Sequence, residues 1–196
     1  MGKLIALILL LYLVSCGSEK PLLYDEVRKQ YADYMINHDK SRLKKSYKTL
    51  IEIEDFKDNG ITTENVLLVL PIFLKMEKYD ELHHLLSKTE VLSQYYKKYY
   101  LNQIRALKYR CKDVETSNSF IHQNLELIKY QMSENQNDSV LYVDYYATKL
   151  YISNLSSVFD EIDSLKKVDK RFTNDFYDHL LKQSIQEMDK EIERCQ

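Results

Sequence analysis

Histidines, cysteines and carboxylates are the side chains of this sequence that could do chemistry, and their spacing does not favour a metal site. His83 and His84 are adjacent, so on a helix they point about 100° apart and cannot both face one ion. Asp80 and His84 are four residues apart and could share an ion. Two ligands make a poor site, however, and a polar pair one turn apart explains them as well. We expect no bound metal.

Nucleophilic catalysis and phosphate binding are disfavoured for similar reasons. Cys111 has no histidine near it in the sequence and falls on an apolar helix stripe, which favours burial over reactivity. Gly60 is the only glycine after residue 17, so a glycine-rich phosphate loop is not expected. The carboxylates at 160–161 and 189–193 are typical of solvated helix faces. We expect no catalytic residue, no cofactor and no enzymatic activity.

The stretch YYKKYY at residues 95–100 interleaves aromatic rings with positive charges, a pattern that can bind a partner. If residues 90–112 form one helix, five basic side chains share a face, here called the basic ridge: Lys97, Lys98, Arg105, Lys108 and Lys112. The tyrosines fall mostly on the remaining arc, which is wide enough to predict packing against neighbours on two sides. The ridge is then either a partner-binding surface or a plain solvated face.

The first residues of the chain indicate export. Lys3 precedes eleven unbroken apolar residues, Leu4 to Val14, a run too short to span a bilayer and typical of a signal peptide over residues 1–15. The run ends in Leu13-Val14-Ser15-Cys16, which resembles the lipobox of bacterial lipoproteins. That resemblance implies cleavage before Cys16, a diacylglycerol on its thiol and a fatty acyl chain such as palmitate on its amine. Residues 16–21 would be the lipidated N-terminus and a short tether.

Charge and cysteine usage fit a protein of the bacterial cell envelope. Glycine rather than aspartate follows Cys16, which by analogy with lipoprotein sorting favours the outer membrane over the inner one. Without Lys3 the formal charge of −2 becomes −3, so the protein as a whole is not expected to bind polyanions, and no nucleic acid is expected as partner. The basic ridge could still meet anionic lipid head groups, an acidic partner or a polyanionic glycan. In an oxidising compartment Cys111 and Cys195 could form a disulfide, or they could be two separate buried thiols.

Apolar residues recur at steps of three and four from residue 22 onward, which predicts an all-α domain over residues 22–196 with no long linker. Pro71 should kink its helix or mark the true start of that helix. Thr62 or Thr63 could cap the third helix, and Asn137 or Asp138 the seventh. About nine helices are expected, the last of them a capping helix with one apolar stripe: 22–37, 41–56, 63–76, 79–88, 90–112, 117–134, 138–153, 156–168 and 173–194.

Two similar segments 80 residues apart suggest internal repetition. Lys78-Tyr79-Asp80-Glu81-Leu82 has its counterpart in Val158-Phe159-Asp160-Glu161-Ile162. The first copy resembles the opening of the second helix in tetratricopeptide repeats. That resemblance implies a right-handed stack of antiparallel helical hairpins, a degenerate tetratricopeptide-like α-solenoid. The large side chains expected at helix crossings and the uneven hairpin lengths depart from the family, so an irregular helical bundle is the alternative.

The function expected from these features is a non-catalytic protein-interaction module, held at the envelope membrane by the lipid on Cys16. Helical solenoids bind partners through extended surfaces and need no cofactor. One alternative is an immunity lipoprotein that neutralises a toxin and would have a single tight partner. A second is an enzyme acting on envelope glycans, which would need converging carboxylates that the sequence does not reveal.

Overall fold

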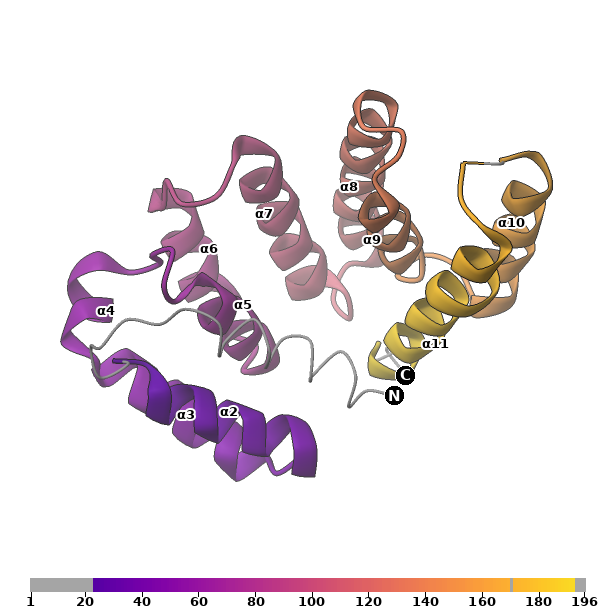
Figure 1. The fold of residues 1–196 in the computed structure, drawn as a ribbon. Coiled ribbons are helices and arrows are strands. Elements are labelled where there is room, and N and C mark those ends of the chain that lie inside the picture. Colours follow the sequence, from indigo (N-terminus) through magenta and orange to yellow (C-terminus); the bar gives the residue numbers. More distant parts are fainter. Residues whose placement is uncertain (1–22, 170, 193–196) are drawn as a thin grey trace. The chain divides into compact units, whose positions relative to one another are not determined.

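The computed structural model describes residues 23–169 and 171–192, and within these ranges the chain is helical with no β-strand (Figure 1). The predicted all-α fold class is confirmed, and the helices pack mainly against their neighbours in sequence. By its internal contacts the chain divides into two compact units, which meet in the sequence between Lys97 and Lys98. The prediction of one domain, like the handedness of the stack, stays a prediction.

Several sequence predictions fall on residues outside the described ranges. They are the signal peptide, the tether and the two cysteines at positions 16 and 195. Within the described ranges, no helix combines the length and the apolar character that crossing a bilayer requires.

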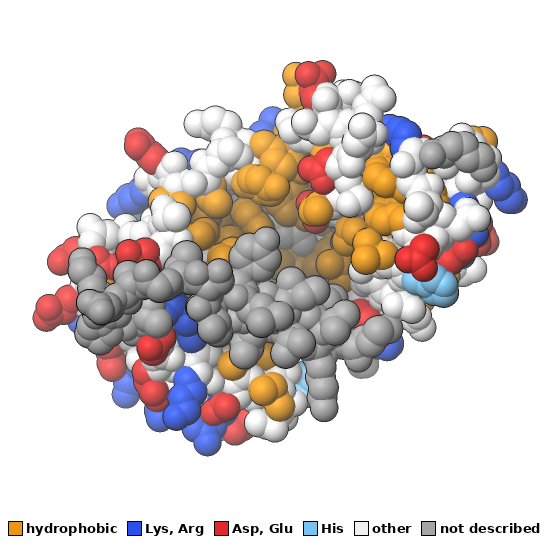
Figure 2. All heavy atoms as spheres, viewed as in Figure 1, with side chains coloured by type: hydrophobic (Ala, Val, Ile, Leu, Met, Phe, Trp, Pro, Cys, Tyr) orange, Lys and Arg blue, Asp and Glu red, His pale blue; other side chains and the backbone are white. Residues whose placement is uncertain are grey.

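In the first unit, consecutive helices pack on one another: α2 against α3, α3 against α4 and α5, and α5 against α6. Tyr47 and Phe56 both approach the ring of Phe73, at centroid distances of 5.2 and 6.1 Å, and Leu50 and Leu82 are fully buried. Charged side chains of both signs cover the visible outer surface of α2 and α3 (Figure 2). The helices are α2 (Asp25–Asn37), α3 (Lys40–Glu52), α4 (Glu54–Asn59), α5 (Val66–Lys75) and α6 (Tyr79–Lys88).

Two helices of this unit begin or end differently from the sequence prediction. The helix expected over 41–56 breaks at Ile53, which is extended, and α4 follows as a separate short helix. This break lets Phe56 pack on Phe73 while Asp55 accepts a hydrogen bond from the Tyr24 hydroxyl (2.8 Å). Pro71 lies inside α5 and does not mark its start.

The boundary between the two units falls within α7 (Gln94–Tyr109), so most of this helix belongs to the second unit. α8 packs on α9, α9 on α11, and α10 on both η1 and α11 (Figure 1). Its main core joins α9 and α10 to the C-terminal helix through fully buried side chains such as Val158, Ile162 and Leu181. The remaining helices are α8 (Val114–Glu134), α9 (Ser139–Lys149), α10 (Leu155–Val168), the π-helix η1 (Phe176–Leu181) and α11 (Lys182–Glu191).

The C-terminal helix predicted over 173–194 exists, but its first turns are the π-helix η1. Here Phe172, Phe176 and Tyr177 pack together with Tyr142 of α9, which makes the start of the helix an aromatic cluster. The predicted apolar stripe is buried from Tyr177 through Leu181 to Ile185 and then opens, since Met188 is exposed.

The two similar sequence segments serve the same packing purpose at different places in their helices. Tyr79 begins α6, whereas Phe159 lies one turn inside α10. In both copies the last aliphatic residue, Leu82 or Ile162, is completely buried. In both copies the glutamate reaches back to an earlier helix, Glu81 to the Tyr47 hydroxyl and Glu161 to Lys149.

Candidate functional site

The five residues of the basic ridge do not form one uniform charged face. The Lys97 ammonium donates to the Thr89 carbonyl oxygen at 2.9 Å, and the Arg105 guanidinium lies over the Phe120 ring at 5.5 Å. Lys98 is exposed and Lys108 is half-buried. α7 runs from Gln94 to Tyr109 and is therefore shorter than the predicted 90–112. As a result, Lys112 lies in the turn after the helix. Partner binding by this ridge stays a prediction.

The tyrosines of YYKKYY are less deeply buried than the helix period suggests. Tyr95, Tyr99 and Tyr100 are half-buried and Tyr96 is 43% exposed. They pack on one another in pairs, Tyr95 edge-on to Tyr96 and Tyr99 edge-on to Tyr100. These rings therefore support α7 locally while keeping part of their surface accessible.

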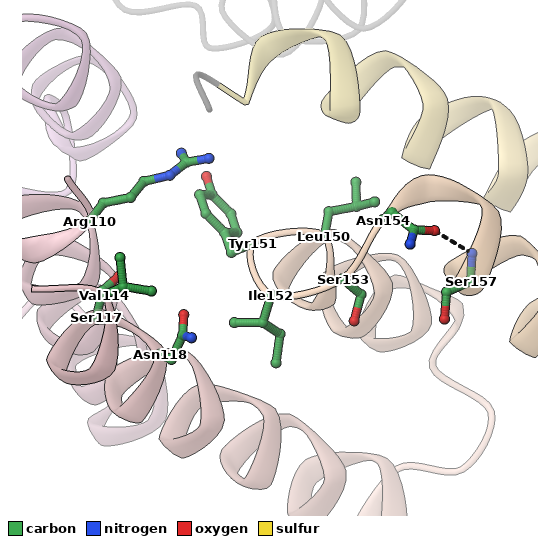
Figure 3. Close-up of a pocket in the computed structure, with 10 residues that line it drawn as sticks. All are labelled: Arg110, Val114, Ser117, Asn118, Leu150, Tyr151, Ile152, Ser153, Asn154 and Ser157. Atoms are coloured by element: carbon green, nitrogen blue, oxygen red, sulfur yellow. Dashed lines mark hydrogen bonds between the residues drawn. The ribbon is translucent and has the colours of Figure 1, made fainter. Parts of the chain in front are cut away.

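An open groove of about 610 Å³ lies within the second unit, where the turn between α7 and α8 meets the connection between α9 and α10 (Figure 3). Its walls come from the end of α7, the first turns of α8, the connection between α9 and α10, and the first turn of α10. Arg110 extends over the Tyr151 ring, 5.1 Å from the ring centroid. The lining residues are Arg110, Val114, Ser117, Asn118, Leu150, Tyr151, Ile152, Ser153, Asn154 and Ser157.

The two helix starts at this groove are capped by their own chain. The Asp113 carboxylate accepts from the Thr116 backbone N–H at 3.0 Å, and the Asn154 side-chain oxygen accepts from Ser157 N–H at 2.9 Å. Capping uses backbone donors that would otherwise attract an anion. The groove thus presents mainly side chains, with Val114 58% exposed at its edge.

Cys111 is engaged in a disulfide bond, in the turn between α7 and α8 and close in sequence to this groove. The predicted burial of Cys111 on a helix stripe is wrong: α7 ends at Tyr109, and Cys111 is exposed. The other cysteines of the chain are Cys16 and Cys195, and both lie outside the described residues. Pairing of Cys111 with Cys195 therefore stays a prediction.

Asp144 on α9 is a half-buried carboxylate. Burial, with a smaller contribution from the charge of Asp138, raises its pKa to about 6. One turn further along α9, the Thr148 hydroxyl is 3.1 Å from the hydroxyl of Tyr99, so α7 and α9 meet at this level. Burial raises the pKa of Tyr99, and the negative charge of Asp144 raises it further.

Asp169 and Arg171 clamp one end of the second unit. The Asp169 carboxylate accepts from the Arg171 Nε at 2.9 Å and from its backbone N–H at 3.0 Å, while the Tyr142 hydroxyl donates to it at 3.3 Å. Arg171 also donates to the Gln136 carbonyl oxygen in the turn between α8 and α9, at 3.1 Å. The bonds from Arg171 lower the pKa of Asp169 to about 2. This clamp holds two turns together and is structural.

The histidine pair does not assemble a metal site within the part of the chain that the structure describes. No group of three His, Cys, Asp or Glu side chains there is placed to hold an ion. His84 is exposed on α6 and His83 is half-buried beside it.

Comparisons with known proteins return no match for this chain, whether against protein-family models, curated proteins or solved structures.

Sequence reasoning missed the groove and Asp144 for different reasons. The groove is lined by residues from separate parts of the chain, such as Val114 and Ile152, and no sequence motif links these parts. Asp144 lies in the segment 142–146. A single acid in such a segment is typical of the solvent-facing side of an ordinary helix, so its spacing alone does not single it out. The signal that could have pointed to it is a single acid on a helix face that otherwise carries uncharged residues: Val140, Leu141, Ala147 and Thr148.

Proposed function

We propose that this protein is a non-catalytic protein-interaction module of the bacterial cell envelope, anchored by lipid on Cys16. Its body would be a degenerate tetratricopeptide-like arrangement of helical hairpins. The observation that carries the proposal is the open groove of the second unit, where hairpin ends leave apolar and hydrogen-bonding groups side by side.

The groove has the chemistry of a site for a protein segment. Val114 and Ile152 offer apolar surface, and Asn118 and Ser153 offer hydrogen-bonding groups near it (Figure 3). A peptide chain presents the same mixture of apolar side chains and backbone polar groups. Because the groove is open rather than enclosed, it suits an extended or helical segment better than a small molecule that must be surrounded.

The membrane part of the proposal is supported by the sequence Leu13-Val14-Ser15-Cys16 behind an apolar run. Two or more acyl chains would give stable anchoring, whereas a single chain gives marginal binding. Tethering confines the module near the membrane surface and raises its effective concentration toward envelope partners.

Site-specific photo-crosslinking in intact cells tests the interaction directly. A photoreactive amino acid at Val114 is expected to capture one defined protein. The same label at Tyr130, exposed on the same helix about 24 Å away, should not capture it. The substitution Ile152→Glu should reduce the Val114 crosslink about tenfold, because it places a charge against the apolar segment. Equal labelling from both positions, or none from Val114, would refute the proposal.

A further inference from the structure

Asp144 carries a negative charge that nothing in the described part of the chain neutralises. Its carboxylate has neither a hydrogen-bond donor nor a basic partner among the described residues, and the other charge that acts on it is the negative Asp138. Lys149 of the same helix pairs with Glu161, and Lys129 of the neighbouring α8 pairs with Glu126. A half-buried carboxylate in this state costs free energy that an incoming cation would recover.

Two tyrosine rings of α7 belong to the same region as this carboxylate. The Tyr99 and Tyr100 rings stand edge to face, with centroids 5.5 Å apart and an interplanar angle of 76°. The Tyr99 hydroxyl lies 3.1 Å from the Thr148 hydroxyl, one helical turn after Asp144, so Tyr99 reaches α9 close to this carboxylate, whose charge acts on the hydroxyl.

The combination of an unpaired carboxylate and tyrosine faces is complementary to an organic cation. A carboxylate supplies the charge, and ring faces attract the positive end of an alkylammonium or guanidinium group within about 6 Å. On α9 the face that carries Asp144 also carries Thr148, and Tyr151, which lines the groove, follows in the turn after the helix. A protein segment seated in the groove could thus extend a basic side chain toward Asp144.

We propose that Asp144 and the Tyr99–Tyr100 pair form a recognition site for a lysine or arginine side chain of the protein partner. This inference rests on the proposed function, because the basic side chain belongs to the segment bound at the groove. It adds a chemical requirement to that function: the partner must carry a positive charge close to the residues that contact Val114 and Ile152.

Carboxyl-carbon NMR of the full chain in detergent solution tests this site without knowledge of the partner. The probes are N-acetyl-lysine methylamide and its arginine counterpart, and the matched apolar control is N-acetyl-norleucine methylamide. Either basic probe is expected to move the Asp144 carboxyl resonance and to lower its pKa from about 6 by about one unit. The norleucine compound should do neither.

Two variants define the specificity of this response. In Asp144→Asn the Tyr99 side-chain shifts induced by the basic probes should disappear, whereas in Asp160→Asn, which removes an exposed acid of α10, they should persist. Asp144→Asn is expected to fold at least as stably as the parent, because it removes an uncompensated charge. No response to the basic probes, or an equal response to norleucine, would overturn the inference.

The outcomes also separate this inference from the proposed function. If Val114 captures a partner but the probes leave Asp144 unchanged, the interaction module stands and the basic-side-chain site is wrong. If the probes bind but Val114 captures nothing, the site stands as a cation site and its assignment to a protein partner fails.

Discussion

Replacing Asn65 with alanine is expected to lower the free energy of unfolding by about 3 kcal/mol, because one fully buried side chain serves several buried groups. Its oxygen accepts from the Thr62 backbone N–H at 2.8 Å. Its nitrogen donates to the Gly60 carbonyl oxygen at 2.8 Å and to the Tyr24 hydroxyl at 3.0 Å. Without Asn65 the Thr62 and Gly60 groups lose this partner where water has little access.

Urea unfolding followed by circular dichroism measures this effect, and Asn59→Ala provides the matched control. Asn59 is an exposed asparagine at the end of α4 that donates to Asp55 at 2.8 Å, so its loss should cost less than about 0.5 kcal/mol. Asn65→Asp keeps the acceptor for Thr62 but loses both donors, and should also destabilise the protein. If Asn65→Ala and Asn59→Ala had equal effects, the buried network around Tyr24 would not stabilise the first unit.

Neutralising Asp169 is expected to cost about 2 kcal/mol at pH 7 and much less in acid. The carboxyl pKa is lowered from 3.8 to about 2 in the folded protein, mainly by its bonds from Arg171. A lowered folded-state pKa adds stability above the unfolded pKa and loses it as the pH falls through the folded pKa. The stability difference between the parent and Asp169→Asn should therefore be constant above pH 5 and shrink between pH 4 and pH 2.

Urea unfolding at several pH values measures this difference. Asp175→Asn is the control, because the Asp175 side chain is 84% exposed and lies 3.9 Å from His179, so little change is expected at any pH. A difference between the parent and Asp169→Asn that stays the same from pH 7 to pH 2.5 would contradict the clamp described for Asp169 and Arg171.

The helices could be predicted because their stability depends on a local pattern. Apolar spacing located every predicted helix to within a few residues, and Asp138 caps α9 as expected, accepting from Val140 N–H at 2.9 Å. The exceptions are set by distant contacts. Ile53 breaks a helix so that Phe56 can reach Phe73, and the π turn at Phe176 accommodates an aromatic cluster.

The polar residues that matter most could not be chosen from the sequence. Thr62 or Thr63 was predicted to cap the third helix. The helix instead begins after Asn65, whose side chain turns inward to Gly60 and Thr62. Asp169 and Arg171, two residues apart, resemble an ordinary charged turn, and burial of the carboxylate distinguishes them. Asp144 becomes notable because α7 and α9 are neighbours, a fact that no local pattern encodes.

Mass spectrometry of the N-terminal peptide from the membrane fraction tests the central claim most directly, namely that the protein works at the envelope on a lipid tether. The account predicts that the peptide begins at Cys16 and carries a diacylglycerol on its thiol together with an acyl chain on its amine. An unprocessed peptide beginning at Met1, with an unmodified Cys16, would contradict the anchored interaction module.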